Sequence, residues 1–264
     1  MTATVVGARP LTVAEASTAP SGAPHGSRGS AHVRLLGSVQ LVRPSGEVVV
    51  PPSAGQRRLL ALLALHAGRT LRAELLCDRA QVSFGALRTT VSRLRRLVGD
   101  EVLLTEAVGY RLDLETDADH FTVGLAASGP GPDELPVLDR ALALWRGRAL
   151  DEFCHEPWAC GEAARLEELR AVAVDRRAAA LMAIGRYGEA VAELDAHVVV
   201  HPLRDRAWGM LIEALAADGR RTDALRAYQR YRSHLAETAG LDPSPSVRAI
   251  ERRVAADDAP VTRG

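Results

Sequence analysis

The sequence contains no lysine, so all 33 of its basic residues other than histidine are arginines. Without lysine the chain cannot form a P-loop of the usual GxxxxGK[ST] type or hold a substrate as a lysine Schiff base. It also lacks a run of about 18 apolar residues, which a membrane-spanning helix needs, and its first 30 residues lack the apolar segment of a signal peptide. We therefore expect a soluble, cytoplasmic protein that does not contact a membrane.

Cysteine is scarce as well. The three cysteines, Cys77, Cys154 and Cys160, are odd in number and form no tight framework, which is typical of a reducing cytosol. A metal site could be considered at Cys154, His155 and Cys160. Because zinc needs a fourth ligand and tighter spacing, we instead expect a loop with reduced thiols here. The sequence shows no Ser/His/Asp arrangement typical of a catalytic triad, no motif of paired carboxylates and no glycine-rich loop of the kind that binds phosphate. We expect neither an enzyme nor a cofactor.

Aromatic residues make up only 4% of the chain. We expect the large ones to anchor the core of a helical region rather than to form a ligand cage; they are Trp145, Trp158, Trp208 and Phe153. His197 and His201 are four residues apart and could share a helix face. Because His201 precedes Pro202, where a helix usually ends, we interpret both as capping or surface histidines.

The net charge is zero, but the charge is unevenly distributed. Residues 55–99 carry nine arginines and two acids, a local charge of +7, whereas residues 1–54 sum to +2 and residues 100–264 to −9. A positive block of this kind is typical of a unit that binds the phosphate backbone of DNA. The acidic remainder would repel DNA and is expected to face another partner.

The positive block contains an amphipathic helix. At 100° per residue one stripe is apolar and consists of Leu87, Val91, Leu94 and Val98. The opposite face carries Thr89, Ser92, Arg93 and Arg96. Arginine pairs with guanine edges or phosphate oxygens, and serine and threonine reach either, so this face suits the major groove of DNA. Many surface helices carry arginines for solubility alone, and that alternative stays open from the helix by itself.

The surrounding pattern predicts a winged helix-turn-helix preceded by a small sheet. Short β-like segments at 33–36, 39–42 and 48–50 come first, with a turn at 44–46. Ser53 is expected to cap a helix that runs to His66 and is closed by Gly68. A short helix at 72–77, the arginine helix from Phe84 and a hairpin at 102–112 come next. Residues 1–31 form a disordered tail and residues 32–115 the winged-helix domain.

The rest of the chain predicts a helical repeat. The segment GRYGEAV at 185–191 recurs as GRRTDAL at 219–225, and the spacing of 34 residues is the tetratricopeptide (TPR) period. Helices around 137–144 and 163–184 complete the stack, after a linker at 128–132. We place an all-α, TPR-like domain at 116–256 and a C-terminal tail at 257–264. The fold class is thus mainly α with a small β component.

These pieces resemble the streptomycete antibiotic regulatory protein (SARP) family, an OmpR-like winged helix joined to a bacterial transcriptional activation domain. The resemblance covers residues 33–255. In the first half it rests on Gln56-Arg57, on VSRLRRL at 91–97 and on GYRL at 109–112. In the second half it rests on ALALWRG at 141–147, RLEELR at 165–170, HPLRD at 201–205 with Trp208, Gly219-Arg220, Ala224-Leu225, Tyr228, and GLDPSP at 240–245.

The resemblance implies a sequence-specific activator that binds direct repeats in double-stranded DNA upstream of biosynthetic promoters, as a dimer, and recruits RNA polymerase holoenzyme. It places the protein at the nucleoid. The positions that match the family's reading helix are Arg88, Thr89, Ser92, Arg93 and Arg96. We expect Thr89, Ser92 and Arg93 nearest the bases, and Arg57, Arg88 and Arg96 on phosphates.

The sequence departs from the family pattern at two places. The segment between the second and third helices is shortened to residues 77–86, where relatives carry a longer stretch thought to touch polymerase. The hairpin carries Glu106, which repels phosphate, where a basic residue is common. Two alternatives therefore remain: a helical-repeat interaction protein with a weakened DNA-binding domain, and a repressor or anti-activator.

Overall fold

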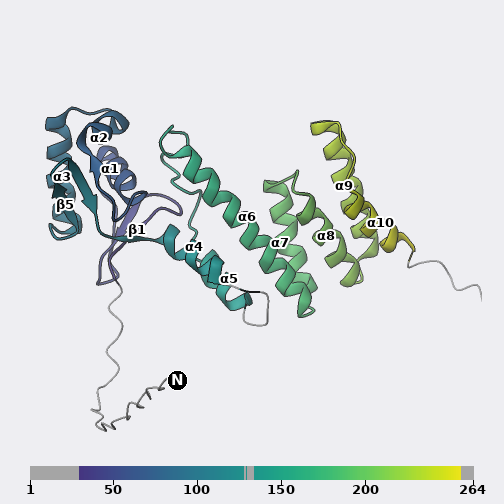
Figure 1. Ribbon diagram of the computed structural model, residues 1–264. Coiled ribbons are helices and arrows are strands. Elements are labelled where there is room, and N and C mark those ends of the chain that lie inside the picture. Colours follow the sequence, from purple (N-terminus) through teal and green to yellow (C-terminus); the bar gives the residue numbers. More distant parts are fainter. Residues whose placement is uncertain (1–29, 128, 130–133, 257–264) are drawn as a thin grey trace, which may run out of the picture.

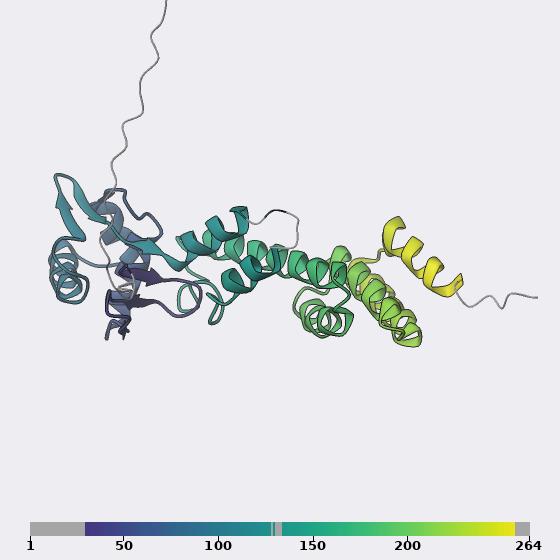
Figure 2. The ribbon, with the colours of Figure 1, turned by 90° about the horizontal axis from the view of Figure 1, so that it is seen from below.

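The computed structural model describes residues 30–127, 129 and 134–256. The predicted tails at 1–31 and 257–264 and the linker at 128–132 lie almost wholly outside the described residues. The described chain is elongated, with strands and three helices at one end and a row of helices leading away from them (Figures 1 and 2). None of the helices described is long and apolar enough to cross a membrane.

A four-stranded sheet opens the chain. It contains β1 (His32–Arg34), β2 (Gln40–Val42), β3 (Val48–Val49) and β7 (Glu115–Thr116), in the order β3-β2-β1-β7. The first three match the predicted segments but are shorter. The last strand, β7, pairs in parallel with β1 across more than 80 residues of chain. Two residues are too few to produce an alternating pattern, and no turn joins β7 to its partner β1, so β7 could not be recognised from the sequence.

Three helices come next, and their caps explain their bounds. The first, α1 (Ala54–Ala64), begins as predicted at Ser53, whose side chain accepts from the Gln56 backbone N–H in a capping box. The second, α2 (Ala73–Ala80), is displaced from the predicted 72–77 because Arg72 belongs to strand β4 (Leu71–Arg72). Gln81 ends α2 in the left-handed region, with φ of 56°. The third, α3 (Phe84–Val98), starts three residues later, so the helix-turn-helix is tight.

The predicted hairpin forms the wing. Its strands β5 (Leu103–Glu106) and β6 (Gly109–Leu112) join β4 in a second sheet of order β4-β6-β5. Gly109 has a close-packing role, because a Cβ atom at this position would lie 1.8 Å from the carbonyl oxygen of Leu71. The glycine therefore lets β6 approach β4.

The helical part consists of α4 (Asp117–Ala127), α5 (Glu134–Leu142), α6 (Cys160–Ala183), α7 (Tyr187–Val200), α8 (Asp205–Ala217), α9 (Arg221–Ala239) and α10 (Pro245–Ala256). The predicted repeat is confirmed in detail. Gly185 ends α6 and Gly219 follows α8, and both have φ of +76°. The alanines five residues further on, Ala190 and Ala224, are fully buried where consecutive helices meet.

The hydrophobic residues form two cores, and the division between them lies within α6. The first core reaches from Val33 in β1 through α1 and α3 to Ala173 in α6. The second begins at Ala178 and continues to Val254 in α10. The winged helix and the first helices of the repeat region therefore share one core. The predicted domain limits at 115 and 116 stay a prediction, whereas the predicted fold class, a winged helix followed by helical repeats, is confirmed.

Candidate nucleic-acid interface

Helix α3 buries one face and exposes the other. Leu87, Val91 and Leu94 are at most 2% exposed, and Val98 is half-buried near the helix end. The five residues assigned to the reading face are all exposed: Arg88, Thr89, Ser92, Arg93 and Arg96. Figure 1 shows that α3 lies at the end of the molecule farthest from α10. The far end of the row of helices therefore lies away from α3.

The arginines on this face are unpaired. Within the described part of the chain, Arg88, Arg93 and Arg96 form no ion pair and no hydrogen bond. Arginines of the helical repeats behave differently: Arg177, for example, contacts Asp139 and Glu193 at 2.6 and 2.7 Å. Because an unpaired guanidinium keeps all five donors for a partner, α3 is equipped to bind phosphate oxygens or guanine edges.

The two hydroxyl residues on the face differ. Thr89 Oγ1 donates to the Gly85 carbonyl at 3.0 Å, so its donor is used within α3 while its lone pairs remain open. The Ser92 hydroxyl makes no hydrogen bond among the described residues and can both donate and accept. Ser92 is therefore the more versatile base-reading group of the two.

His66, just after α1, is influenced by charges of both signs. Burial lowers the pKa of His66, and the charges of Arg79 and Arg69 lower it further, whereas the charge of Glu162 raises it.

A groove of about 610 Å³ separates the start of α3 from the wing. Arg72 and Arg88 line it together with Glu106, Val108 and Tyr110, and Val108 is 58% exposed at the tip of the wing. Glu106 Oε1 lies 3.1 Å from Arg111 Nη1. The repulsion expected from Glu106 is therefore partly offset within the wing, a pairing that the sequence did not reveal.

Arg95 holds the wing against α3 and was not among the predicted site residues. Its Nε donates to the Leu103 carbonyl at 2.8 Å and its Nη2 to Thr105 Oγ1 at 2.7 Å. In sequence it is one of three arginines within four positions. Its position four residues after buried Val91, at the edge of the apolar stripe, is the signal that could have indicated that it faces the wing.

Arg57 lies apart from the α3 face. Its Nε contacts Glu152 at 2.6 Å and its Nη1 donates to the Pro51 carbonyl at 3.1 Å. Its neighbour Arg58 pairs with Glu156 at 2.6 Å. Both pairs tie α1 to the segment before α6. The expected phosphate contact of Arg57 stays a prediction, and it would require the pair with Glu152 to open.

Asp117 fastens the winged helix to the helical region. This carboxylate is 2% exposed and accepts from the Leu35 backbone N–H at 2.6 Å and from that of Leu36 at 3.3 Å. Arg146 pairs with it at 3.2 Å and also donates to the Ser38 carbonyl. Burial raises the pKa of Asp117, although these hydrogen bonds oppose the shift. A buried polar contact thus joins the turn after β1 to the start of α4 and to Arg146.

The aromatic residues, the cysteines and His201, which the sequence analysis also considered, occupy positions in the core, in loops or at a helix end. Trp145, Trp208 and Phe153 are buried, which confirms their role as core anchors, and Trp158 is half-buried. Cys154 is buried and Cys160 exposed, and no group of three or more His, Cys, Asp or Glu within the described ranges could hold a metal ion. His201 caps α7 as expected.

The surface assignment is wrong for His197. It is only 7% exposed because it lies on the side of α7 that packs against α6. There its Nε2 lies 3.3 Å from Asp175 Oδ1. The compensating carboxylate is 22 positions away in the sequence, on another helix. The spacing of the two histidines could not reveal it.

Comparison with known proteins gives a consistent result. A family model described as the bacterial transcriptional activator domain matches residues 124–255. Regulatory protein AfsR of Streptomyces griseus is 33% identical, over 87% of this chain and 25% of AfsR. Transcriptional regulatory protein EmbR of Mycobacterium tuberculosis H37Rv is 32% identical, over 83% of this chain and 62% of EmbR. Regulatory protein DnrI of Streptomyces peucetius is 28% identical, over 88% of this chain and 94% of DnrI.

A solved structure agrees with these relatives. The structure described as Mycobacterium tuberculosis EmbR in complex with low affinity phosphopeptide matches with a TM-score of 0.75 and 30% identity, covering 85% of this chain and 65% of that one. The chain spans a quarter of AfsR and less than two thirds of EmbR. With the winged helix, the repeats and the family model in agreement, the chain belongs to the SARP family of transcriptional regulators.

Proposed function

We propose that this protein is a sequence-specific transcriptional activator that binds direct repeats in double-stranded DNA as a dimer and recruits RNA polymerase. Its targets would be promoters of a biosynthetic, secondary-metabolite gene cluster, and its place in the cell the nucleoid. Family membership supports the proposal, as do relatives that are named regulatory proteins. The acidic helical repeats would face the transcription machinery rather than DNA, because their charge repels phosphate.

The observation that carries the proposal is the set of unpaired, exposed arginines on α3. In the proposed complex Thr89, Ser92 and Arg93 read base edges in the major groove. Arg88 and Arg96 contact phosphates on either side, and Arg57 would join them once it is released from Glu152. The groove beside the wing would take the sugar-phosphate backbone next to Arg72.

The test is a binding titration with labelled promoter fragments that contain heptameric direct repeats. Arg93→Ala should weaken binding to the repeats by roughly 5- to 150-fold, since a good base contact contributes about 1–3 kcal/mol of discrimination. Arg232→Ala on α9, another exposed arginine that lacks a partner among the described residues, is the matched control and should bind like the wild type. The proposal fails if no complex forms at low salt and Arg93→Ala changes nothing.

A second candidate function is an interaction protein or repressor whose winged helix binds DNA weakly. The three-residue turn at 81–83 favours it, because the segment thought to touch polymerase in relatives has no room there. In vitro transcription with polymerase holoenzyme separates the two. An activator raises transcript yield from a repeat-containing template, whereas a repressor binds the same template and lowers the yield.

A further inference from the structure

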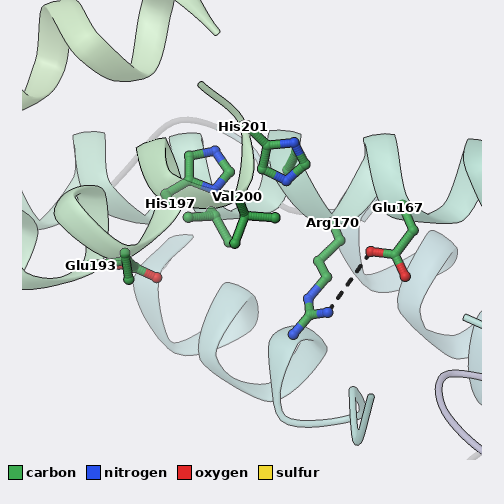
Figure 3. Close-up of a pocket in the computed structure, with 9 residues that line it drawn as sticks. Glu167, Arg170, Glu193, His197, Val200 and His201 are labelled. Carbon is green, nitrogen blue, oxygen red and sulfur yellow. Dashed lines mark ion pairs between the residues drawn. The ribbon is translucent and has the colours of Figure 1, made fainter. Parts of the chain in front are cut away.

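Helices α6 and α7 enclose a small pocket that the DNA-binding proposal does not use. Its volume is about 280 Å³. In Figure 3, Arg170 and Glu167 lie on one side, His197 and His201 stand beside Val200, and Glu193 closes the other side. The floor is aliphatic and is formed by Ala171, Val174 and Ala196. An engineered cavity of about 150 Å³ holds benzene, so this pocket has room for one to two rings.

Both carboxylates of the pocket already have partners in the chain. Glu167 Oε1 accepts from the Ala149 backbone N–H at 2.7 Å. Glu193 Oε2 pairs with Arg177 at 2.7 Å, and burial raises the pKa of Glu193 against the influence of that pair. Neither acid is therefore available as the main partner of a cationic ligand.

Arg170 is the least satisfied charged group of the pocket. Its Nη1 donates to the Gly147 carbonyl at a long 3.4 Å, and its contact with Glu167 is 3.8 Å, beyond hydrogen-bond distance. The guanidinium stacks over the ring of Trp145 at 4.7 Å, which fixes its plane. A planar, oriented guanidinium with unused donors matches a carboxylate that binds through both oxygens.

The wall beside Arg170 suits a flat ring. The imidazoles of His197 and His201 have centroids 4.8 Å apart and are tilted by 53°. Burial lowers the pKa of His201, and the charges of His197 and Arg204 lower it further, which favours the uncharged ring. Val200, 71% exposed, extends the apolar surface at the mouth. Imidazole rings and aliphatic carbons favour the face of an aromatic ligand.

We propose that this pocket binds a small aromatic carboxylic acid, with its carboxylate on Arg170 and its ring against His201 and the aliphatic floor. The site lies in the helical region, away from α3, and the proposal does not depend on DNA binding.

Isothermal titration calorimetry on the full chain tests the site with two matched pairs of probes. Salicylate and indole-3-carboxylate carry the acid, and salicylamide and indole-3-carboxamide keep the ring without the charge. We expect each acid to bind at least about 10-fold more tightly than its amide, because hydrogen bonds to a charged group are the stronger kind. Equal affinities, or no saturable binding of either acid at about 10 mM, would overturn the proposal.

Three variants locate the binding. Arg170→Gln should weaken the acids by about 10- to 100-fold, to the level of the amides. Arg165→Gln, at an exposed position on the same helix where Arg165 pairs with Glu162, should leave all probes unaffected. Ala196→Leu at an exposed position should exclude acids and amides alike by filling the pocket. Unchanged acid binding in Arg170→Gln would disprove the site, and since no readout involves DNA, it would leave the activator proposal standing.

Discussion

At the scale of single residues, buried carboxylates connect segments that are distant in the sequence. Asp117 accepts from backbone N–H groups 82 and 81 positions earlier, in the turn after β1. Composition and periodicity describe neighbours along the chain, so no pattern could assign such a partner. Neither helix α4, which Asp117 begins, nor a role for this residue was predicted from the sequence.

Replacement of Asp117 should therefore be costly. Asp117→Ala leaves two buried N–H groups and Arg146 without their acceptor, and breaking a buried pair of this kind costs about 3–5 kcal/mol. Urea unfolding measures the loss. Asp100→Ala serves as the control, because Asp100 is 89% exposed and lies 3.7 Å from Arg95, so its loss should change stability by less than about 0.5 kcal/mol. A small effect of Asp117→Ala would show that water replaces the carboxylate.

Asp175 should make stability depend on pH. Burial alone would raise the pKa of Asp175, but His197 and Arg204, the latter at 2.8 Å, hold it below its ordinary value of 3.8. A carboxyl with a lowered folded pKa stabilises the protein above its unfolded pKa and loses that effect as the pH falls toward the folded value. Asp175→Asn should thus cost about 3 kcal/mol at pH 7, and the difference from the wild type should shrink below about pH 4.

Urea titrations at several pH values follow that difference. Asp195→Asn is the matched control, because Asp195 forms an exposed pair with Arg230 at 3.3 Å and should contribute less than about 1 kcal/mol at any pH. A difference between wild type and Asp175→Asn that stays constant down to pH 3 would mean that the charge of Asp175 is not what stabilises α6 against α7.

At the scale of elements, the sequence predicted the helix starts and ends that are determined by residues next to them in the chain. Ser53 marked the start of α1, and the glycines of the 34-residue repeat marked two helix ends. The end of α2 was missed because Gln81, not a glycine, takes the left-handed conformation there. Strands β4 and β7 were missed because each pairs only with a strand that is distant in the sequence. The equally short β3 was predicted because the turn at 44–46 joins it to its partner β2.

The wing depends on one glycine. Gly109→Ala should displace β6 from β4, because the new Cβ would lie 1.8 Å from the Leu71 carbonyl oxygen, an atom of the backbone. We expect a loss of about 1–3 kcal/mol or more in unfolding free energy, together with weaker DNA binding. Thermal unfolding and the promoter titration measure the two effects.

The matched control for that change is Gly161→Ala in α6. A Cβ at Gly161 would meet no atom within 4 Å, and alanine favours the helix by up to about 1 kcal/mol, so stability should stay level or rise. If Gly109→Ala behaved like Gly161→Ala, the approach of β6 to β4 would not be needed for the wing.

At the scale of the whole molecule, the shared core makes the winged helix dependent on the first helices of the repeat region. Phe121 in α4 and Trp145 after α5 pack edge to face with centroids 5.2 Å apart, and both belong to the core that contains Val33 and Leu59. A fragment of residues 30–116 loses several large side chains worth about 1.5–3 kcal/mol each, against a net stability of about 5–15 kcal/mol. We expect no cooperative thermal transition for it.

A longer fragment provides the control. Residues 30–177 retain every residue of the first core, which ends at Ala173, and should unfold cooperatively. If the 30–116 fragment melted within a few degrees of the longer one, the winged helix would be an independent domain after all, and the contacts of Asp117 and Trp145 would be peripheral.

The candidate interface was predictable from the sequence only where it depends on residues that are close together in the chain. The block of charge +7 and the 3.6-residue period placed Arg93 and Arg96 on one exposed face, and the resemblance to the family added Arg88. Whether a given arginine is free or paired is a property of the whole molecule. Arg57 and Arg95 resemble their neighbours in sequence, yet acceptors 95 and 8 positions away engage them.

That distinction can be measured from the salt dependence of DNA binding. The logarithm of the binding constant falls with the logarithm of salt concentration, with a slope of about −0.9 per phosphate contact. Arg88→Ala and Arg96→Ala, the proposed phosphate contacts, should each reduce the slope by about one and weaken binding equally on repeat and random DNA. Arg93→Ala should change the slope less and remove the preference for repeats. Because the proposed complex releases Arg57 from Glu152, Arg57→Ala should also reduce the slope by about one, and an unchanged slope would show that Glu152 keeps that side chain in the complex. The four slopes together would assign each arginine to base, phosphate or protein.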